Sequence, residues 1–410
     1  MPRPIPLPRE GPLSGLLSRD GPLSPLRPAV RDLHPGYFAL VMATGIVSVA
    51  LDAAGAGWLS ALLLWLAIAA FLVLTAGYGW RLARYPRAVL ADAADPGRAF
   101  GFFTVVAGAD VLGARLAADG DQAVTAVLLA VAGLAWLVLS YGIPLGLATR
   151  RAPHSALAGV NGTWFLWAVG TQSIAVSATA LLPAAGGPAG LLTAVAVGAW
   201  SVGVVLYLLI AGLVLAGLFQ FPVEPAAMTP AYWVFMGATA ISVLAGARLL
   251  ALPPEPLLAG VRPVVAGLSV ILWAFGTWLI PLLTGFGVWR HLVRGVRLRY
   301  EPPLWSMVFP LGMYCVASHA LGGVLHVAWL AALGRDGTWV AFAVWAVVFA
   351  AMLGRFAGLP RRRAGGPGPG RPASLFQVRG VVEAADDPPV AVGDQPGDRP
   401  VVRGDKRERA

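Results

Sequence analysis

The stretch that decides the fold is residues 34–46, HPGYFALVMATGI, which opens the first long apolar run of the chain. The rest of the sequence has the same character, because 58% of the 410 residues are hydrophobic and only 12% are charged. An ordinary soluble domain has roughly 25% charged residues, so this composition excludes a soluble globular protein and a disordered chain. The single cysteine, Cys315, excludes a disulfide scaffold. The sequence is therefore typical of a polytopic membrane protein.

Ten stretches are long enough to cross the hydrocarbon core, which takes about 20 apolar residues in a helix. Continuous apolar runs lack the two-residue alternation of a barrel strand, so we predict an all-α membrane protein. A polar N-tail at 1–33 precedes the transmembrane domain at 34–357, and a Gly- and Pro-rich C-tail at 358–410 is expected to be disordered. The predicted spans are 35–54, 59–80, 99–117, 122–146, 160–182, 188–218, 230–251, 262–284, 303–322 and 337–357.

The arginines indicate the orientation of these spans. Cytoplasmic loops of membrane proteins collect Lys and Arg, and here the two tails and the even-to-odd loops hold most of the arginines. The opposite loops offer only Arg115, Arg248, Arg262 and Arg335. We therefore expect a multi-pass protein of the plasma (inner) membrane with both termini in the cytoplasm. The cytoplasmic arginines include Arg3, Arg9, Arg19, Arg27, Arg31, Arg81, Arg84, Arg87, Arg98, Arg150, Arg151, Arg290, Arg294, Arg297, Arg299, Arg361, Arg362 and Arg363.

The spans also show an internal repeat and a division by polarity. At a constant offset of 195, Pro35, Tyr37 and Thr44 of the first span recur as Pro230, Tyr232 and Thr239 of the seventh. Both spans run the same way, which indicates a parallel repeat. The odd-numbered spans carry most of the polar side chains. The loops between spans 1–2, 3–4 and 5–6 are very short, so we predict that consecutive spans pair as five hairpins. Because polar side chains in lipid seek protein or water, we also predict an inner ring of odd helices and an outer ring of even ones.

An axial path lined by the odd helices is one interpretation of this polarity. The alternative is that Ser and Thr hold the helices together, since small and hydroxyl residues pack transmembrane helices closely. The predicted pore-lining residues are Tyr37, Thr44, Ser48, Asp110, Thr171, Gln172, Thr239, Ser242 and Met313.

Few ionisable groups lie inside the spans. Asp110 is the one deep acidic residue, and such a group is a functional candidate by default. It could bind a proton in a coupled carrier or pair with Arg115 or Arg248, which are also the predicted vestibule charges. His319 and His326 lack a third ligand for a metal site. No hydrolase, nucleotide-binding or metalloprotease motif is present, and we expect no enzyme activity, no cofactor and no nucleic-acid partner.

Several motifs resemble one family of transporters. Residues 34–46 are similar to the first span of the tellurite-resistance/dicarboxylate transporter family, which includes malate permeases, sulfite exporters and slow anion channels. Further similar stretches are 103–108 (FTVVAG), 161–164 (NGTW) with 171–173 (TQS), and 305–312 (WSMVFPLG). The motifs occur in order from about residue 34 to 357.

The resemblance implies a fold and a function. It implies ten helices as five hairpins in a quasi-fivefold arrangement, one pore per protomer lined by the odd helices, and a homotrimer in the bilayer. It also implies a pore plugged by a phenylalanine of the ninth span, here Phe309. The expected substrate is a small anion, either a dicarboxylate such as malate or an inorganic oxyanion such as sulfite or tellurite. The alternatives are a proton-coupled dicarboxylate carrier that uses Asp110 and a membrane-embedded enzyme or sensor.

Overall fold

The computed structural model describes residues 26–149, 159–187, 189–220 and 224–358, and every regular element within these ranges is a helix. Ten of the described helical segments are long and apolar enough to cross a membrane, which confirms the predicted fold class. Residues 1–25 of the predicted N-tail, the C-tail from 359 onward, and Arg150 and Arg151 lie outside the described residues.

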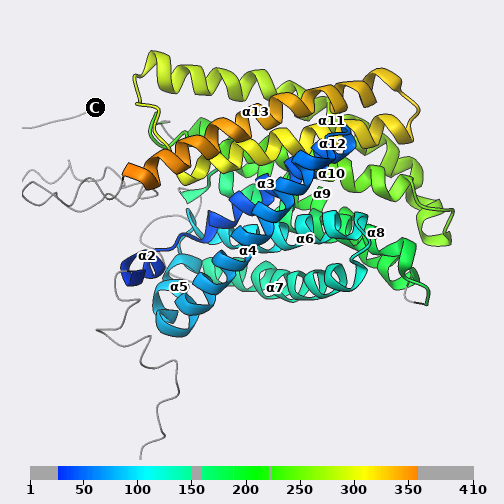
Figure 1. The fold of residues 1–410 in the computed structure, drawn as a ribbon, viewed down its shortest axis with the longest axis horizontal. Coiled ribbons are helices and arrows are strands. Elements are labelled where there is room, and N and C mark those ends of the chain that lie inside the picture. The colour runs from blue at the N-terminus through cyan, green and yellow to red at the C-terminus, as the bar shows by residue number, and fades with distance from the viewer. Residues whose placement is uncertain (1–25, 150–158, 188, 221–223, 359–410) are drawn as a thin grey trace, which may run out of the picture. The chain divides into compact units, whose positions relative to one another are not determined.

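Long helices alternate with shorter ones along the chain (Figure 1). The odd spans are formed by α3 (Ala39–Ala53), α6 (Phe103–Ala118), α8 (Phe165–Leu181), α10 (Val234–Leu250) and α12 (Trp305–Val324). The even spans are formed by α4 (Gly57–Arg84), α7 (Gln122–Thr149), α9 (Ala189–Gln220), α11 (Pro256–Val288) and α13 (Ala328–Gly358). Two short helices, α2 (Arg27–Arg31) and α5 (Pro86–Ala93), lie beside the spans.

The last span begins earlier than predicted. The sequence placed its start after the charged pair Arg335 and Asp336, but α13 begins at Ala328. Both side chains are more than half exposed and lie 3.0 Å apart, from Arg335 Nε to Asp336 Oδ1. Charges that remain exposed do not interrupt a helix, so the hydropathy pattern underestimated its length.

The odd helices form a closed inner ring. In the described chain, α3 packs against α6, α6 against α8, α8 against α10, α10 against α12, and α12 again against α3. In the most apolar stretch of each odd span 61–94% of the residues are buried, against 17–28% in the even spans. This difference confirms that the odd helices lie inside and the even helices outside.

Each inner helix starts with a 3-10 turn, and these initial turns also contact one another in a ring. At the first turn, His34 Nδ1 accepts a hydrogen bond from the Gly36 amide at 2.9 Å. At the third, Asn161 Oδ1 accepts from the Thr163 amide at 2.8 Å. Because all five turns meet at one end, the inner helices run in parallel, as the repeat predicts. The turns are η2 (Pro35–Phe38), η3 (Ala99–Phe102), η5 (Gly162–Trp164), η7 (Pro230–Trp233) and η9 (Pro302–Leu304).

Glycine allows two of these turns to approach closely. A Cβ added to Gly162 would lie 2.4 Å from the carbonyl oxygen of Ala231 in η7. Real Cβ atoms do not come this close to backbone, so η5 and η7 can pack together only because residue 162 has no side chain.

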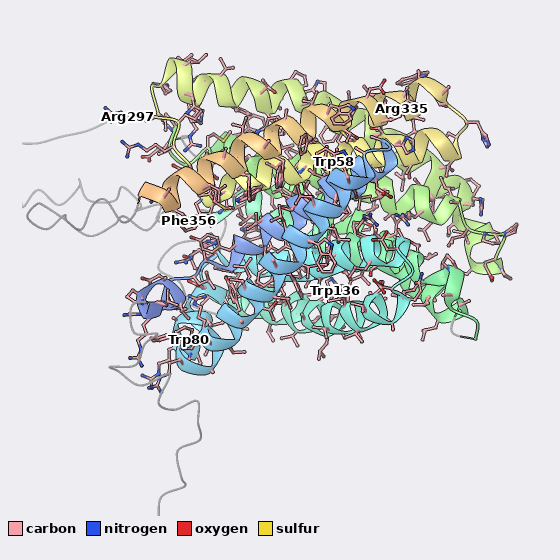
Figure 2. The ribbon with its side chains drawn as sticks, in the orientation of Figure 1. Trp58, Trp80, Trp136, Arg297, Arg335 and Phe356 are labelled. Atoms are coloured by element: carbon pink, nitrogen blue, oxygen red, sulfur yellow. The ribbon has the colours of Figure 1, made fainter. Side chains whose placement is uncertain are left out.

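We call the end that carries the initial turns the basic end. Figure 1 shows α2, α5 and the last turn of α13 at this end, and Figure 2 shows Arg297 there, with Arg335 toward the opposite end. The basic end contains a buried cluster in which Asp92 lies 2.6 Å from Arg81 and 3.2 Å from Arg98. Arg81 Nε also donates to the carbonyl oxygen of Arg31 at 2.9 Å. The cluster therefore joins α2, α4, α5 and η3.

Candidate functional site: the inner face of the helix ring

The position of Phe309 follows from the contacts of α12 with its neighbours. On one side Pro310 packs against α10, because a Cβ added to Gly237 would lie 2.8 Å from Pro310 Cγ. On the other side Gly312 packs against α3, where Ile46 would lie 2.9 Å from an added Cβ. These contacts show which side of α12 packs against α10 and which side packs against α3.

Hydrogen bonds show which side of α12 faces the outer helix α11. Tyr314 Oη lies 2.7 Å from Thr277 Oγ1 of α11, and Ser318 Oγ accepts from the indole of Trp273 at 3.0 Å. Successive residues of an α-helix are rotated by about 100°, so Phe309 lies on the face opposite these two, and Met313, four residues later, lies on the same side of the helix as Phe309. That face points to the interior of the ring. Both side chains are only 1% exposed.

Other inner helices also carry buried apolar residues on the faces that turn away from the outer layer. In both cases the residue lies on the face opposite those that contact outer helices: Ile46 is two residues, or about 200°, from Thr44 and Ser48, and Ile241 is two residues from Thr239, which contacts Gly276 of α11. These side chains are at most 2% exposed. Ile46 of α3, Ile241 of α10 and Phe309 of α12 are thus buried apolar residues on inner helices, and Ala107 of α6 is equally buried.

Most of the polar residues predicted to line a pore are directed to outer helices instead. In four places an indole N–H of an outer helix binds the next inner helix. These hydrogen bonds are Trp345 Nε1 to Thr44 Oγ1 at 3.1 Å, Trp136 to Thr171 Oγ1 at 2.8 Å, Trp200 to the Ser242 carbonyl at 3.1 Å, and Trp273 to Ser318 Oγ at 3.0 Å. The sequence interpretation missed these tryptophans, although one recurs in each of four hairpins.

Ser48, Gln172 and Thr239 also contact the outer layer. Ser48 Oγ donates to the Ser60 carbonyl of α4, and Ser60 Oγ donates back to the Ser48 carbonyl, both at 2.8 Å. Gln172 Nε2 donates to the Trp200 carbonyl at 3.1 Å, and Thr239 Oγ1 would lie 2.5 Å from a Cβ on Gly276 of α11. These hydroxyl and amide groups hold the two layers together, which is the packing interpretation rather than the pore-lining one.

Tyr37 lies in η2 at the basic end, where it is half-buried. Its ring contacts His34 edge to face, with 6.5 Å between the centroids. It is therefore near the start of the inner ring rather than at the level of Phe309.

Asp110 is fully buried between two inner helices. Ser173 of α8 donates to Asp110 Oδ2 at 2.8 Å, and Ser177 of the same helix is a second hydroxyl neighbour of the carboxyl group. The predicted ion pair with Arg115 or Arg248 is wrong, because no cation lies within 4.0 Å of Asp110 among the described residues. The Asp110 side chain points sideways along the ring toward α8, and Arg115 of the same helix is turned to α3 and α4.

The two predicted vestibule arginines differ. Arg115 is 5% exposed and engaged by Asp119, by Asp52 at 3.4 Å and by Ser60 at 3.1 Å. Arg248 is half-buried near the end of α10 opposite the basic end. It lies nine residues from Thr239, half a helical rotation away, so it faces the interior. No acidic residue in the described chain pairs with it.

His34 is held neutral at the basic end. Burial, together with the nearby guanidinium groups of Arg98 and Arg81, lowers the pKa of His34 to about 3. The neutral ring is needed because its Nδ1 accepts the hydrogen bond that begins η2. No sequence motif pointed to this role, which depends on burial and on arginines distant in sequence.

His319 and His326 have different surroundings. His319 Nδ1 lies 3.1 Å from the Ala331 carbonyl oxygen, and His326 occupies the turn before α13 with φ of 58°. No group of three or more metal-ligating side chains that could hold an ion occurs in the part of the chain that the structure describes.

Comparison with known proteins agrees with this architecture. Residues 32–353 match the family described as voltage-dependent anion channel. An uncharacterized membrane protein of Mycobacterium tuberculosis is 49% identical over 148 residues, which cover 36% of this chain and 75% of that protein. An uncharacterized transporter of Methanocaldococcus jannaschii is 23% identical over 326 residues, covering 78% of this chain and 92% of that protein. The chain belongs to the voltage-dependent anion channel family.

Proposed function

We propose that the protein carries small anions across the membrane along the axis of the inner ring, and that Phe309 closes this path in the structure described above. The observation that carries the proposal is the orientation of α12. Its contacts with α3, α10 and α11 leave Phe309 and Met313 facing the interior. Family membership favours transport over the enzyme or sensor considered from the sequence.

The proposed gate works by excluding water. Phe309, Ile46, Ala107 and Ile241 are buried and offer no hydrogen bonds. An ion crosses such a dry constriction only by losing hydration at high cost, which is how hydrophobic gates block channels. Pro310 follows directly and cannot donate to the Ser306 carbonyl, so the helix can bend beside the gate.

Arg248 is the proposed anion-attracting group. It faces the interior, and no described acidic residue neutralises it. A cation near the mouth of a low-dielectric passage raises the local concentration of anions. Arg115 is left out of this role because two carboxylates engage it. Thr44, Ser48, Thr171, Gln172, Thr239 and Ser242 are likewise assigned to packing, which leaves Phe309, Met313 and Arg248 as the core of the proposed path.

We also propose a membrane topology, an oligomeric state and a set of substrates. The described beginning and end of the chain lie together at the basic end (Figure 1), which supports cytoplasmic termini under the positive-inside rule. A plasma-membrane homotrimer and a quasi-fivefold pore in each protomer are proposed from the resemblance. Malate-type dicarboxylates and the oxyanions sulfite and tellurite remain the proposed substrates.

Flux measurements in proteoliposomes test the function. Chloride, nitrate, sulfite, malate and succinate should be compared in protein-containing and empty vesicles, and at least one anion should cross faster with the protein. Arg248→Gln should slow this flux, whereas Arg335→Gln, an exposed arginine paired with Asp336, should not. If none of these anions crosses faster than in empty vesicles, the proposed function is wrong.

A second candidate is a proton-coupled carrier that uses Asp110. It is favoured by a buried carboxyl group that has a serine donor and no described cation partner. A carboxyl group in this position can take up and release a proton during transport. Asp110→Asn keeps an oxygen that accepts from Ser173, so the variant should fold. If the wild-type flux follows a pH gradient and the variant loses this dependence, coupling is supported; equal pH dependence in both contradicts it.

A further inference from the structure

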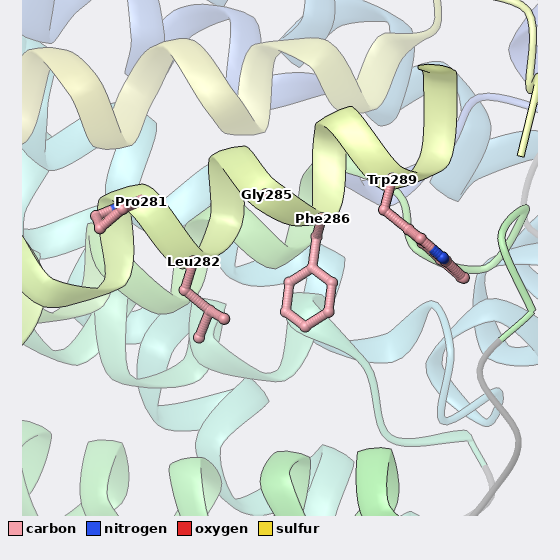
Figure 3. A pocket seen from close by; sticks show the side chains of 5 residues that line it. All are labelled: Pro281, Leu282, Gly285, Phe286 and Trp289. Carbon is pink, nitrogen blue, oxygen red and sulfur yellow. The ribbon is translucent and has the colours of Figure 1, made fainter. Parts of the chain in front are cut away.

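The outer helix α11 carries an apolar groove near its basic end. The groove has a volume of about 460 Å³ and is lined by Pro281, Leu282, Gly285, Phe286 and Trp289. Figure 3 shows Leu282, Phe286 and Trp289 pointing from the same side of the helix. Pro281 and Trp289 are eight residues apart, or about 12 Å along a helix, which is within one leaflet of the ~30 Å hydrocarbon core.

A basic turn is built at one end of this groove. After α11 the chain forms a π-helical turn, η8 (Trp289–Val293), and then a tight turn at Gly295 with φ of 68°. His291 Nδ1 lies 2.7 Å from the Val296 carbonyl oxygen, and the Val296 amide donates to the Arg290 carbonyl at 3.1 Å. These contacts fold the segment back toward the end of α11.

The turn separates its arginines into two kinds. Arg290 is buried and lies 3.8 Å from Glu301. Arg294 is exposed and stacks over Trp289, with 5.2 Å between its guanidinium carbon and the ring centroid. Arg297 and Arg299 are exposed and have no acidic partner among the described residues. The groove thus ends in an interfacial tryptophan covered by an arginine, beside two further cations.

We propose that this groove and turn bind an anionic phospholipid, with an acyl chain against Pro281–Trp289 and the headgroup phosphate at Arg294 and Arg297. The charge pattern favours a lipid, because the sequence contains no acidic residue from 256 to 300. Exposed Leu292, Val293 and Leu298 lie between the arginines, an arrangement suited to the membrane interface. Clusters of basic residues directly beside a transmembrane helix attract anionic headgroups.

Two kinds of variant separate the headgroup contact from the acyl contact. The double variant Arg294→Gln/Arg297→Gln removes charge from exposed positions. Gly285→Leu fills the groove, and it should fold because nothing lies within 4 Å of a Cβ at residue 285. The matched controls are Arg87→Gln, an exposed arginine of α5, and Gly267→Leu, an exposed glycine of α11 that is also open.

Native mass spectrometry of the full chain, titrated with phosphatidylglycerol or phosphatidylcholine, measures retained lipid and oligomer mass together. The wild type should retain phosphatidylglycerol more tightly. Each arginine removed should weaken that preference about fivefold, so the double variant should lose roughly 25-fold, and Gly285→Leu should weaken both lipids. Both controls should match the wild type.

Three results would overturn the proposal. The double variant could retain phosphatidylglycerol like the wild type. Arg87→Gln could lose about fivefold of the preference, as much as is expected for each arginine of the turn, which would indicate diffuse charge attraction. Finally, Gly285→Leu could change the oligomer mass and leave lipid retention unaltered, which would make the groove a contact between copies of this chain.

Discussion

The inner and outer helices of this protein differ in length, polarity and surroundings. The inner helices have 15–20 residues, carry the hydroxyl groups and are almost completely surrounded by protein. The outer helices have 28–33 residues and expose large apolar side chains such as Leu72 and Trp65. At 1.5 Å per residue, 28–33 residues span about 42–50 Å, more than the ~30 Å hydrocarbon core requires. The outer layer meets the lipid, and the inner layer is free to be short, polar and closely packed.

The largest difference between the two layers should appear when a side chain is added at a glycine. Gly162→Val places a side chain on the backbone of Ala231, so overpacking should destabilise the protein by about 3 kcal/mol or more. Gly198→Val in the outer helix α9 meets nothing within 4 Å. We expect loss of monodisperse Gly162→Val protein in size-exclusion chromatography and an unchanged profile for Gly198→Val. Similar profiles for the two would mean that the initial turns are not closely packed.

The next effect concerns pH and the basic end. Because the pKa of His34 is lowered in the folded protein, the unfolded chain binds the proton more tightly. Stability is therefore fully present above pH 6.5, the ordinary value for this group, and falls toward pH 3 by about 1.4 kcal/mol per pH unit. Melting temperatures measured from pH 7 to pH 5 should fall.

His34→Asn provides the control for that measurement. Asn161 begins η5 with the same kind of hydrogen bond that His34 makes in η2, so asparagine should keep the turn without titrating. The variant should lose less stability than the wild type between pH 7 and pH 5. Parallel melting curves for the two proteins would show that His34 contributes nothing to the pH dependence.

The smallest predicted effect concerns the indole hydrogen bonds between the layers. Trp345→Phe leaves Thr44 Oγ1 without its donor, which should cost about 0.6 kcal/mol and at most about 1.7 kcal/mol in a membrane protein. Trp65 of α4 is 69% exposed, and Trp65→Phe should change nothing. Thermal unfolding in one detergent compares them, and an equal shift for both would remove the proposed role of these bonds.

The sequence was sufficient for the layers and insufficient for the details of the site. Apolar runs and polarity predicted the ten spans and the inner position of the odd helices, because burial in lipid depends on composition. The direction of a single hydroxyl group depends on which neighbour supplies a donor. Thr44 and Thr171 were expected to face a path, but tryptophans from other hairpins engage them. Arg115 was expected to be a vestibule charge, but it is bound by Asp52 and Asp119.

Phe309 shows why the remaining assignment needed structural contacts. A phenylalanine in a span usually packs between helices, and only the family resemblance and the proline that follows it set Phe309 apart from Phe165 in the sequence. The two differ in environment: Phe165 stacks on Phe235 of α10 with 4.5 Å between ring centroids, whereas Phe309 lies on the face of α12 that its neighbours leave toward the interior. The comparison of these two residues provides the sharpest test.

The most direct measurement is the anion conductance of Phe309→Ala and Phe165→Ala in planar bilayers, together with their melting temperatures. If Phe309 closes an axial path, Phe309→Ala should conduct anions strongly and remain folded, because removing the ring admits water to the constriction. Phe165→Ala should lose about 3–5 kcal/mol of stability as a large-to-small core substitution and gain no conductance. A destabilised Phe309→Ala protein with wild-type or lower conductance would contradict the account.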